Sequence, residues 1–253
     1  MDNKNVSTEG IILSQIKHKE SSKILNVLTK DLGKIQIYAQ GALKPKSELL
    51  LVSEQFSKSE LSLTKSRNFY YIKHSSLINP HLGLRKDINK IMIGKYLLEL
   101  ADKTLAVDLG FEKIYDLLST GLDYLERIDS KDILKFLITY EIKYISFLGY
   151  RPILNECSNC GSKDYERMYF NNGFGGLVCA QCVLGTDKFV KLSKEDIEIL
   201  NKMLYTKFID LNSIIIKDDS ILYKLQSIIS DYISYSTEIL KFNNLEMYEK
   251  LMI

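Results

Sequence analysis

The chain has 253 residues, of which 45% are apolar and 26% are charged, and its net charge is +2. These values are ordinary for a globular protein, and they exclude a wholly disordered chain, a collagen and a disulfide-held miniprotein. The sequence contains no apolar run near the roughly 20 residues of a membrane-spanning helix, and its polar start does not resemble a signal peptide. We therefore expect a cytoplasmic protein without a membrane anchor.

The charge is distributed unevenly. Residues 1–80 contain 12 Lys and Arg against 7 Asp and Glu, whereas residues 81–253 contain 22 against 25. A basic N-terminal third favours a polyanion as partner, although chance and solvated lysines give the same count. Only 5 of the basic residues are Arg. Because Lys is a point charge and Arg is the usual bidentate reader of bases, we expect contacts to a nucleic-acid backbone rather than to a sequence.

The first part of the chain has the pattern of short β-strands. Residues 33–39 alternate between apolar and more polar side chains, with Lys34 and Tyr38 on the polar face. Strands are predicted at residues 10–19, 24–29, 33–39, 60–64 and 69–72. Five short strands in so few residues favour a small closed barrel, of which the OB-fold is the common type. A lone sheet packed on the helical part of the chain is the alternative.

From residue 80 the apolar residues recur with a helical period. Helices are predicted at residues 91–105, 114–125, 133–148, 193–204 and 221–239. The third ends at Gly149, Ser193 begins a capping box, and Asp218 with Asp219 caps the last one. The predicted fold is α+β and multidomain: an OB-fold DNA-binding domain over residues 1–79, then an α-helical domain over residues 80–253.

All four cysteines lie in one segment, as Cys157-x-x-Cys160 and Cys179-x-x-Cys182. This spacing is typical of a four-thiolate Zn²⁺ site, because each pair can aim two sulfurs at one ion from a tight turn. We predict one structural Zn²⁺ in a ribbon over about residues 153–185, with a hairpin turn at residues 171–173. Iron would accept the same ligands, and two disulfides are the alternative in an oxidising compartment.

A basic cluster in the predicted barrel is the second informative feature. We predict that DNA contacts Lys17, Lys19, Lys23, Lys34, Tyr38, Lys44 and Lys46. Lysines neutralise phosphates and an aromatic ring stacks on a base, which is how single strands are bound without sequence preference. A solvated face is the alternative. Of the neighbouring aromatic residues, we expect Phe69 and Tyr71 to pack in the core.

Short motifs follow one another in a distinctive order over about the first 185 residues. The N-terminal ones are residues 9–13 (EGIIL), 20–21 (ES), 28–34 (LTKDLGK), 39–42 (AQGA) and 44–47 (KPKS). The central ones are residues 148–152 (LGYRP) and then the four cysteines with Gly161, Gly175 and Gly176. This ordered set resembles the RecO family of bacterial DNA repair and recombination mediators. Leu43 departs from the resemblance, since an Arg-rich stretch is expected there.

The resemblance implies an OB-fold and a helical domain with a zinc ribbon, which bind single- and double-stranded DNA. It implies annealing of complementary strands coated by single-stranded-DNA-binding protein (SSB). It further implies that the protein acts with RecR to load RecA onto SSB-coated DNA, in the RecF pathway of homologous recombination after DNA damage. The C-terminal tail of SSB would contact the helical domain. The protein would be cytoplasmic, and associated with the nucleoid when on DNA.

Two other classes of function stay open on the sequence. A zinc-stabilised protein-interaction scaffold would have the same cysteines and helices but would not bind oligo-dT. An enzyme acting on nucleic acid would need clustered carboxylates for Mg²⁺ or a nucleophilic Lys motif, and the sequence shows neither pattern. We therefore predict no catalytic residues.

Overall fold

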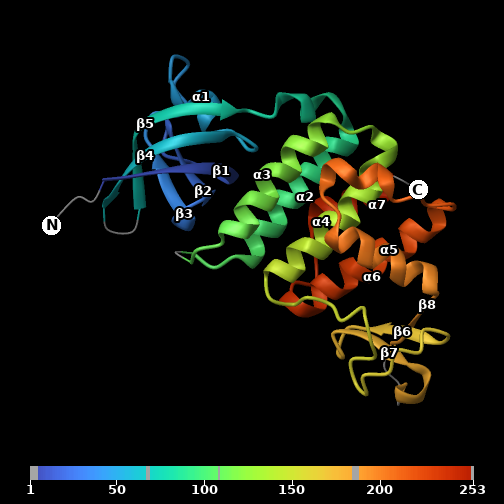
Figure 1. Ribbon diagram of the computed structural model, residues 1–253. Helices are drawn as coiled ribbons and strands as arrows, with labels where there is room; N and C mark the ends of the chain where they lie inside the picture. Colours follow the sequence, from blue (N-terminus) through green and yellow to red (C-terminus); the bar gives the residue numbers. More distant parts are fainter. Residues whose placement is uncertain (1–4, 67–68, 108, 184–187, 252–253) are drawn as a thin grey trace. The chain divides into compact units, whose positions relative to one another are not determined.

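The structure, a computed structural model, describes residues 5–66, 69–107, 109–183 and 188–251. Its internal contacts divide the chain into two compact units (Figure 1). The first, here called the barrel unit, is formed by Met1–Arg127 with Phe242–Ile253, and the second, the ribbon unit, by Ile128–Lys241. Within the described residues, strands β1 to β5 come first in the chain and most of the helices follow them. Strands and helices are thus largely segregated along the sequence, which confirms the predicted α+β fold class.

A closed β-barrel forms the N-terminal part of the barrel unit. Its strands are β1 (Asn5–His18), β2 (Ser22–Thr29), β3 (Gly33–Ala39), β4 (Lys58–Ser66) and β5 (Phe69–Asn79). Their order around the barrel is β1-β2-β3-β5-β4, and β3 with β5 is the parallel pair. Alternate side chains fill the interior, among them Ile12, Leu25, Val27, Ile35, Ile37, Leu61, Leu63 and Tyr70. The predicted OB-type barrel is therefore confirmed.

Four barrel strands are longer than their alternation predicted, and β1 and β5 exceed it the most. β1 begins at Asn5 because residues 5–11 pair with β4, and β5 continues to Asn79 because it pairs with the other edge of β4. These extensions are rich in polar residues, so they give little alternation signal. The four-residue helix α1 (Leu49–Val52), which is too short to show a helical period, was not predicted.

Three helices complete the barrel unit: α2 (Ile88–Thr104), α3 (Glu112–Arg127) and α7 (Asn243–Leu251). α2 packs on β1, and α7 returns from the C-terminal end of the chain to pack on α2. Glu99 of α2 accepts hydrogen bonds from the backbone N–H groups of Asn243 and Asn244, which caps α7. The barrel unit thus extends beyond residue 79. The division into domains over residues 1–79 and 80–253 stays a prediction.

The buried side chain of His81 joins the barrel to α3. Its Nδ1 lies 2.9 Å from the carbonyl oxygen of Phe56, and its Nε2 lies 3.0 Å from Oδ1 of Asp123. The backbone of His81 is left-handed, with φ of 47°. Both ring nitrogens have partners, so this histidine has a structural role that no sequence pattern indicated.

The ribbon unit contains α4 (Ile133–Phe147), α5 (Lys194–Tyr205) and α6 (Asp219–Thr237). Its small sheet has the order β7-β6-β8, formed by β6 (Met168–Asn171), β7 (Gly176–Cys179) and β8 (Val190–Leu192). Short 3₁₀ helices lie at Leu82–Lys86, Ser130–Asp132, Ala180–Cys182 and Phe208–Ser213 of the chain. Ser193 Oγ accepts from Asp196 N while the Asp196 carboxylate accepts from Ser193 N, which confirms the capping box.

The turn between β6 and β7 is longer than the two-residue turn that Asn-Gly predicts. Asn171 pairs with Gly176, so four residues form the turn. The side chain of Asn171 accepts a hydrogen bond from Phe174 N, and the carbonyl oxygen of Asn172 accepts one from Gly175 N. These bonds, with φ of 68° at Gly175, stabilise a turn that places Cys179 at the end of β7.

Candidate metal centre and nucleic-acid interface

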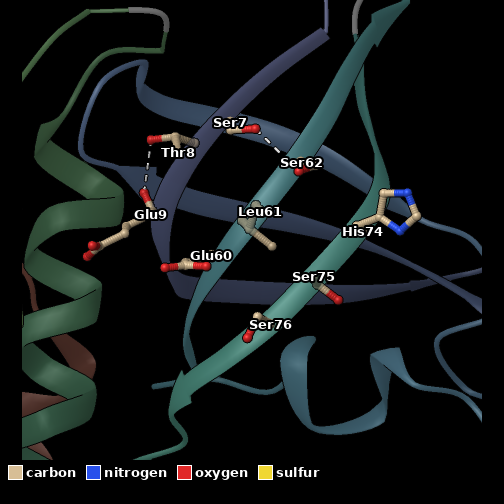
Figure 2. A pocket seen from close by; sticks show the side chains of 9 residues that line it. All are labelled: Ser7, Thr8, Glu9, Glu60, Leu61, Ser62, His74, Ser75 and Ser76. Carbon is tan, nitrogen blue, oxygen red and sulfur yellow. Dashed lines mark hydrogen bonds between the residues drawn. The ribbon is translucent and has the colours of Figure 1, made fainter.

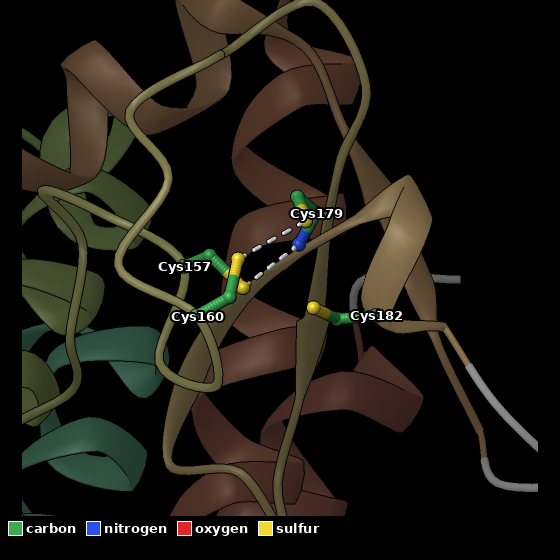
Figure 3. Close-up of side chains that lie close together, drawn as sticks. All are labelled: Cys157, Cys160, Cys179 and Cys182. Atoms are coloured by element: carbon green, nitrogen blue, oxygen red, sulfur yellow. Dashed lines mark hydrogen bonds between the residues drawn. The ribbon is translucent and has the colours of Figure 1, made fainter.

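The four cysteines converge in the ribbon unit (Figure 3). Their Sγ atoms all lie within 4.8 Å of one another, and Cys160 Sγ is 3.7 Å from Cys179 Sγ. A tetrahedron with metal–sulfur distances of 2.3 Å has edges of about 3.8 Å. The spacing of the sulfur atoms therefore fits a tetrahedral ion, and the cluster could hold one metal ion.

Local hydrogen bonds build the turn that carries Cys157 and Cys160. Gly161 N donates to the carbonyl oxygen of Cys157, and Cys157 N donates to that of Ser162, both over 2.8 Å. Gly161 has φ of 73°, which a residue with a side chain adopts only with strain. Ser158 N then bonds to the carbonyl oxygen of Leu177 in β7, so the first cysteine pair is fixed against the strand that leads to the second.

The thiols of Cys157 and Cys160 differ in acidity. Burial alone would raise the pKa of Cys157, but backbone N–H groups, first that of Cys179, lower it to about 6. At Cys160 a backbone hydrogen bond from Ser162 acts in the lowering direction, but the neighbouring sulfurs raise its pKa to about 12. Several thiolates this close repel one another unless a cation lies between them. This donor set is the one that a divalent, thiophilic ion completes.

Two of the predicted DNA-contacting lysines are buried in the barrel unit. Lys23 is 5% exposed, and its Nζ donates to Gln15 Oε1 over 2.6 Å and to Glu54 Oε1 over 2.8 Å. Lys34 is 9% exposed, and its Nζ donates over 2.5 Å to the carbonyl oxygen of Asp102 in α2. In this conformation neither ammonium group reaches solvent as a phosphate ligand would, so both lysines stabilise the barrel instead.

The other predicted lysines are exposed around the β1–β2 hairpin: Lys17, Lys19, Lys44 and Lys46. Lys44 and Lys46 lie in the loop after β3, whose Leu43 N donates over 2.9 Å to the carbonyl oxygen of Ser21 in the hairpin. This bond brings the loop to the hairpin tip. Lys17 pairs directly with Lys23 and so points to the opposite face of the hairpin from Tyr38.

Tyr38 is half-buried on the outer face of β3 and is accompanied by further aromatic rings. Its ring centroid lies 5.6 Å from that of His18 and 5.6 Å from that of Tyr71. Tyr71 is 37% exposed, whereas Tyr70 is buried inside the barrel. The expectation that Tyr71 packs in the core is thus wrong. The strand register explains this difference. Tyr70 pairs with Ile37, which faces the core, and Tyr71 pairs with Tyr38, which faces outward.

A second part of the barrel surface, on β1, β4 and β5, contains a shallow groove of about 410 Å³ (Figure 2). Serine hydroxyls line it, and Ser7 Oγ lies 3.3 Å from Ser62 Oγ. Glu9 and Glu60 stand directly opposite each other there. Glu9 also accepts from Tyr115 over 3.0 Å, and hydrogen bonds from Tyr115 and Lys58 lower the pKa of Glu9 against the effect of burial. Two carboxylates make this groove unsuited to a polyanion.

Comparisons with known proteins match both the barrel and the helical part that carries the cysteines. The family description "Recombination protein O N terminal" matches residues 1–81, and "Recombination protein O C terminal" matches residues 85–246. Together these matches span both compact units. The chain belongs to the RecO family.

Curated RecO-family relatives match most of the chain. The "DNA repair protein RecO" of Alkaliphilus metalliredigens is 29% identical over 250 residues, which cover 97% of this chain and 99% of that protein. The protein of the same name from Thermoanaerobacter sp. (strain X514) is 33% identical over 177 residues, 70% of this chain and 71% of that protein. That from Caldanaerobacter subterraneus subsp. tengcongensis is 29% identical over 232 residues, 90% and 91% of the two chains.

Within the described residues, none of the helices combines the length and the apolar character that crossing a membrane requires.

Proposed function

We propose that this RecO-family protein is a DNA-binding recombination mediator that acts by binding rather than by catalytic turnover. The observation that carries the proposal is the β1–β2 hairpin end of the barrel: Lys19, Lys44 and Lys46 are exposed there, and the half-buried ring of Tyr38 contacts His18 of the same hairpin. Exposed cations near an aromatic ring suit a flexible polyanion with accessible bases. Lys17 adds charge at the same hairpin, while Lys23 and Lys34 are assigned to the fold.

In this proposal the protein anneals complementary single strands coated by SSB. With RecR it helps to load RecA onto SSB-coated DNA, in the RecF pathway of DNA repair in the cytoplasm. Family membership supports these steps, since curated relatives across most of the chain's length are named DNA repair proteins. A sequence-tolerant backbone contact also suits annealing, because annealing must work on any sequence.

The proposal is tested by fluorescence anisotropy with labelled oligo-dT. We expect binding that weakens steeply between low and physiological salt, because phosphate neutralisation releases counterions. A strand-annealing assay with SSB-coated oligonucleotides should then show faster annealing when the protein is added. Absence of binding at low salt would contradict the proposal and leave the protein-interaction scaffold as the better description.

For the metal, we propose one structural Zn²⁺ held by Cys157, Cys160, Cys179 and Cys182. The spacing of their sulfur atoms and the all-thiolate donor set support Zn²⁺. Four protein ligands fill the tetrahedron, so the ion would cross-link the two knuckles and offer no open position for a reacting molecule. Metal analysis of protein purified without chelator, with the thiols kept reduced, distinguishes zinc from iron.

For the SSB tail, we propose a cleft of about 240 Å³ in the ribbon unit. Its Arg151 guanidinium lies over the ring of Tyr205, 5.2 Å from the centroid, and Leu154 and Leu204 provide an apolar lining. A cation beside apolar side chains suits a tail that is both acidic and apolar. Binding of a labelled tail peptide to the wild type, with loss of binding on Arg151→Ala, tests this assignment.

A further inference from the structure

A row of apolar side chains crosses the outer face of the barrel over four strands, exposed at its two ends and half-buried in the middle. In the strand register Ile16 pairs with Ile24, Ile24 with Tyr38, and Tyr38 with Tyr71. Directly paired residues point to the same side of a sheet, so these four side chains form one line, here called the outer stripe. Ile16 is 65% exposed and Tyr71 is 37% exposed. A contiguous apolar surface that stays partly exposed is a common sign of a binding site.

The next row on the same face is polar and is partly covered by α2. Ser14 pairs with Asn26 and Asn26 with Gln36, and these polar side chains are hydrogen-bonded to one another. Ser14 Oγ also donates to Asp102 of α2 over 2.7 Å. The helix therefore covers the Ser14 and Asn26 part of this row, while Gln36 and the outer stripe beside it stay open to solvent.

The rings of the outer stripe are held in a fixed arrangement. The planes of Tyr38 and Tyr71 are inclined by 58°, so the two rings offer separate faces rather than one flat surface. His18 meets Tyr38 edge to face, with an interplanar angle of 82°, and so supports that ring from the hairpin side. Rings fixed in this way lose little conformational freedom when a planar ligand stacks on them.

Cations lie at both ends of the outer stripe. Lys19 is exposed at the hairpin tip beside His18, and Lys73 is exposed two residues after Tyr71, where the pairing of β5 with β4 is irregular. Within the described residues no carboxylate forms an ion pair with either of them. A strand that runs along the stripe would therefore meet a phosphate partner at each end and aromatic rings between.

From this arrangement we infer that Tyr71, with Tyr38 supported by His18, forms a stacking platform for two unpaired bases, which makes this face selective for single-stranded over double-stranded DNA. The inference rests on the proposed function and adds Tyr71 and His18 to the residues predicted from the sequence. Only unpaired bases can present their faces to the two rings, because bases in a duplex are covered by their neighbours. Duplex DNA would meet the lysines alone.

The absence of Trp from the chain allows a direct test. A Tyr71→Trp variant carries a single tryptophan, whose fluorescence should be quenched when oligo-dT stacks on it. The matched control is Tyr223→Trp, at a residue of α6 that is 51% exposed and lies outside the barrel unit. Stacking predicts quenching in the first variant and none in the control. Equal responses in the two variants, at saturating oligo-dT, would overturn the inference.

Affinities give an independent measurement. Tyr71→Ala should weaken oligo-dT binding roughly thirtyfold, the middle of the range for one base stacked on an aromatic ring. It should leave duplex binding within about twofold, and Tyr71→Phe, which keeps the ring, should bind as the wild type does. Circular dichroism serves as the control for folding. If the wild type binds oligo-dT and folded Tyr71→Ala binds it with the same affinity, the platform is excluded but the proposed function stands. If the wild type does not bind oligo-dT, the proposed function itself is refuted.

Discussion

The barrel contains two pairs of lysines whose surroundings differ sharply. Lys23 and Lys34 are buried, and oxygen atoms of other residues hold each ammonium group. Lys44 and Lys46 are exposed in a turn that is hydrogen-bonded to the β1–β2 hairpin. One residue type thus stabilises the fold in the first pair and presents charge to solvent in the second.

Desolvation accounts for the difference. DNA could recruit Lys23 only by removing it from Glu54, which would leave a partly buried carboxylate without its partner. An exposed lysine gives up only water and a counterion when it meets a phosphate. Stability should therefore depend on the first pair, and DNA affinity on the second.

The largest expected effect concerns the four cysteines rather than either pair of lysines. It tests whether the barrel folds and binds DNA independently of the ribbon unit. Structural zinc contributes on the order of 10 kcal/mol of apparent binding free energy. Cys160→Ser should therefore lose the metal and loosen residues 153–183, while DNA binding by the barrel stays within about twofold of wild type. Metal analysis and hydrogen exchange measure these outcomes.

Ser158→Ala is the matched control, because Ser158 lies in the same turn and is not one of the four clustered cysteines. It should keep a full equivalent of metal. Loss of barrel folding in Cys160→Ser would show that the two units are not independent, and full metal retention would remove Cys160 from the ligand set.

The second effect concerns the buried pair. Lys23→Ala should lower the free energy of unfolding by about 2 to 3 kcal/mol, somewhat less than for a fully buried ion pair, since Glu54 is partly exposed. Lys17→Ala, at the exposed residue directly paired with Lys23, should change it by less than about 0.5 kcal/mol. Urea unfolding followed by circular dichroism gives both values. Equal losses in the two variants would contradict the structural role of Lys23.

The third effect concerns the exposed pair. The double change Lys44→Ala with Lys46→Ala should leave stability nearly unchanged, because exposed lysines contribute little to folding. It should weaken DNA binding equally for all sequences and reduce the slope of log affinity against log salt by up to about two units. Salt titrations by anisotropy measure the slope. Identical slopes in wild type and a folded double variant would move the DNA site away from this loop.

A fourth, smaller effect appears as a pH dependence. Burial alone would raise the pKa of Glu54, but hydrogen bonds from Lys23 and Gln15 lower it below its usual value. Its contribution to stability is thus fully present above the unfolded pKa of about 4.3 and is lost as pH falls through the lower folded value. In Lys23→Met this dependence should flatten, so the stability difference from wild type should shrink below about pH 4. A difference that is constant from pH 7 to pH 3 would contradict the pairing.

The smallest expected effect is the response to DNA sequence. Lysines that contact phosphates and rings that stack on any base do not distinguish one base from another. Random oligonucleotides of equal length should therefore bind within a few-fold of one another at fixed salt. A preference of about 10³-fold for one sequence would require direct readout of base edges.

Much of the fold could be predicted because its signals are local. Alternation in residues 33–39 indicated β3, and the helical period with Ser193 as cap indicated α5. The helix α7 could not be predicted in the same way, since its position depends on Glu99, 144 residues earlier in the chain. Phe69–Ile72 is an almost wholly apolar run, so its sequence does not indicate which side chains face the core. Its pairing with β3 decides this.

The sequence by itself determined the cysteine pairs and the strand pattern, because each depends on residues only a few positions apart, where backbone geometry fixes which side chains meet. Only the tertiary structure decided which lysines are available to DNA. Lys23 meets Glu54 across 31 residues and Lys34 meets Asp102 across 68, and no periodicity encodes such a meeting. The same long-range pairing turned Tyr71 outward beside Tyr38, because strand register fixes the direction of every side chain in a closed barrel.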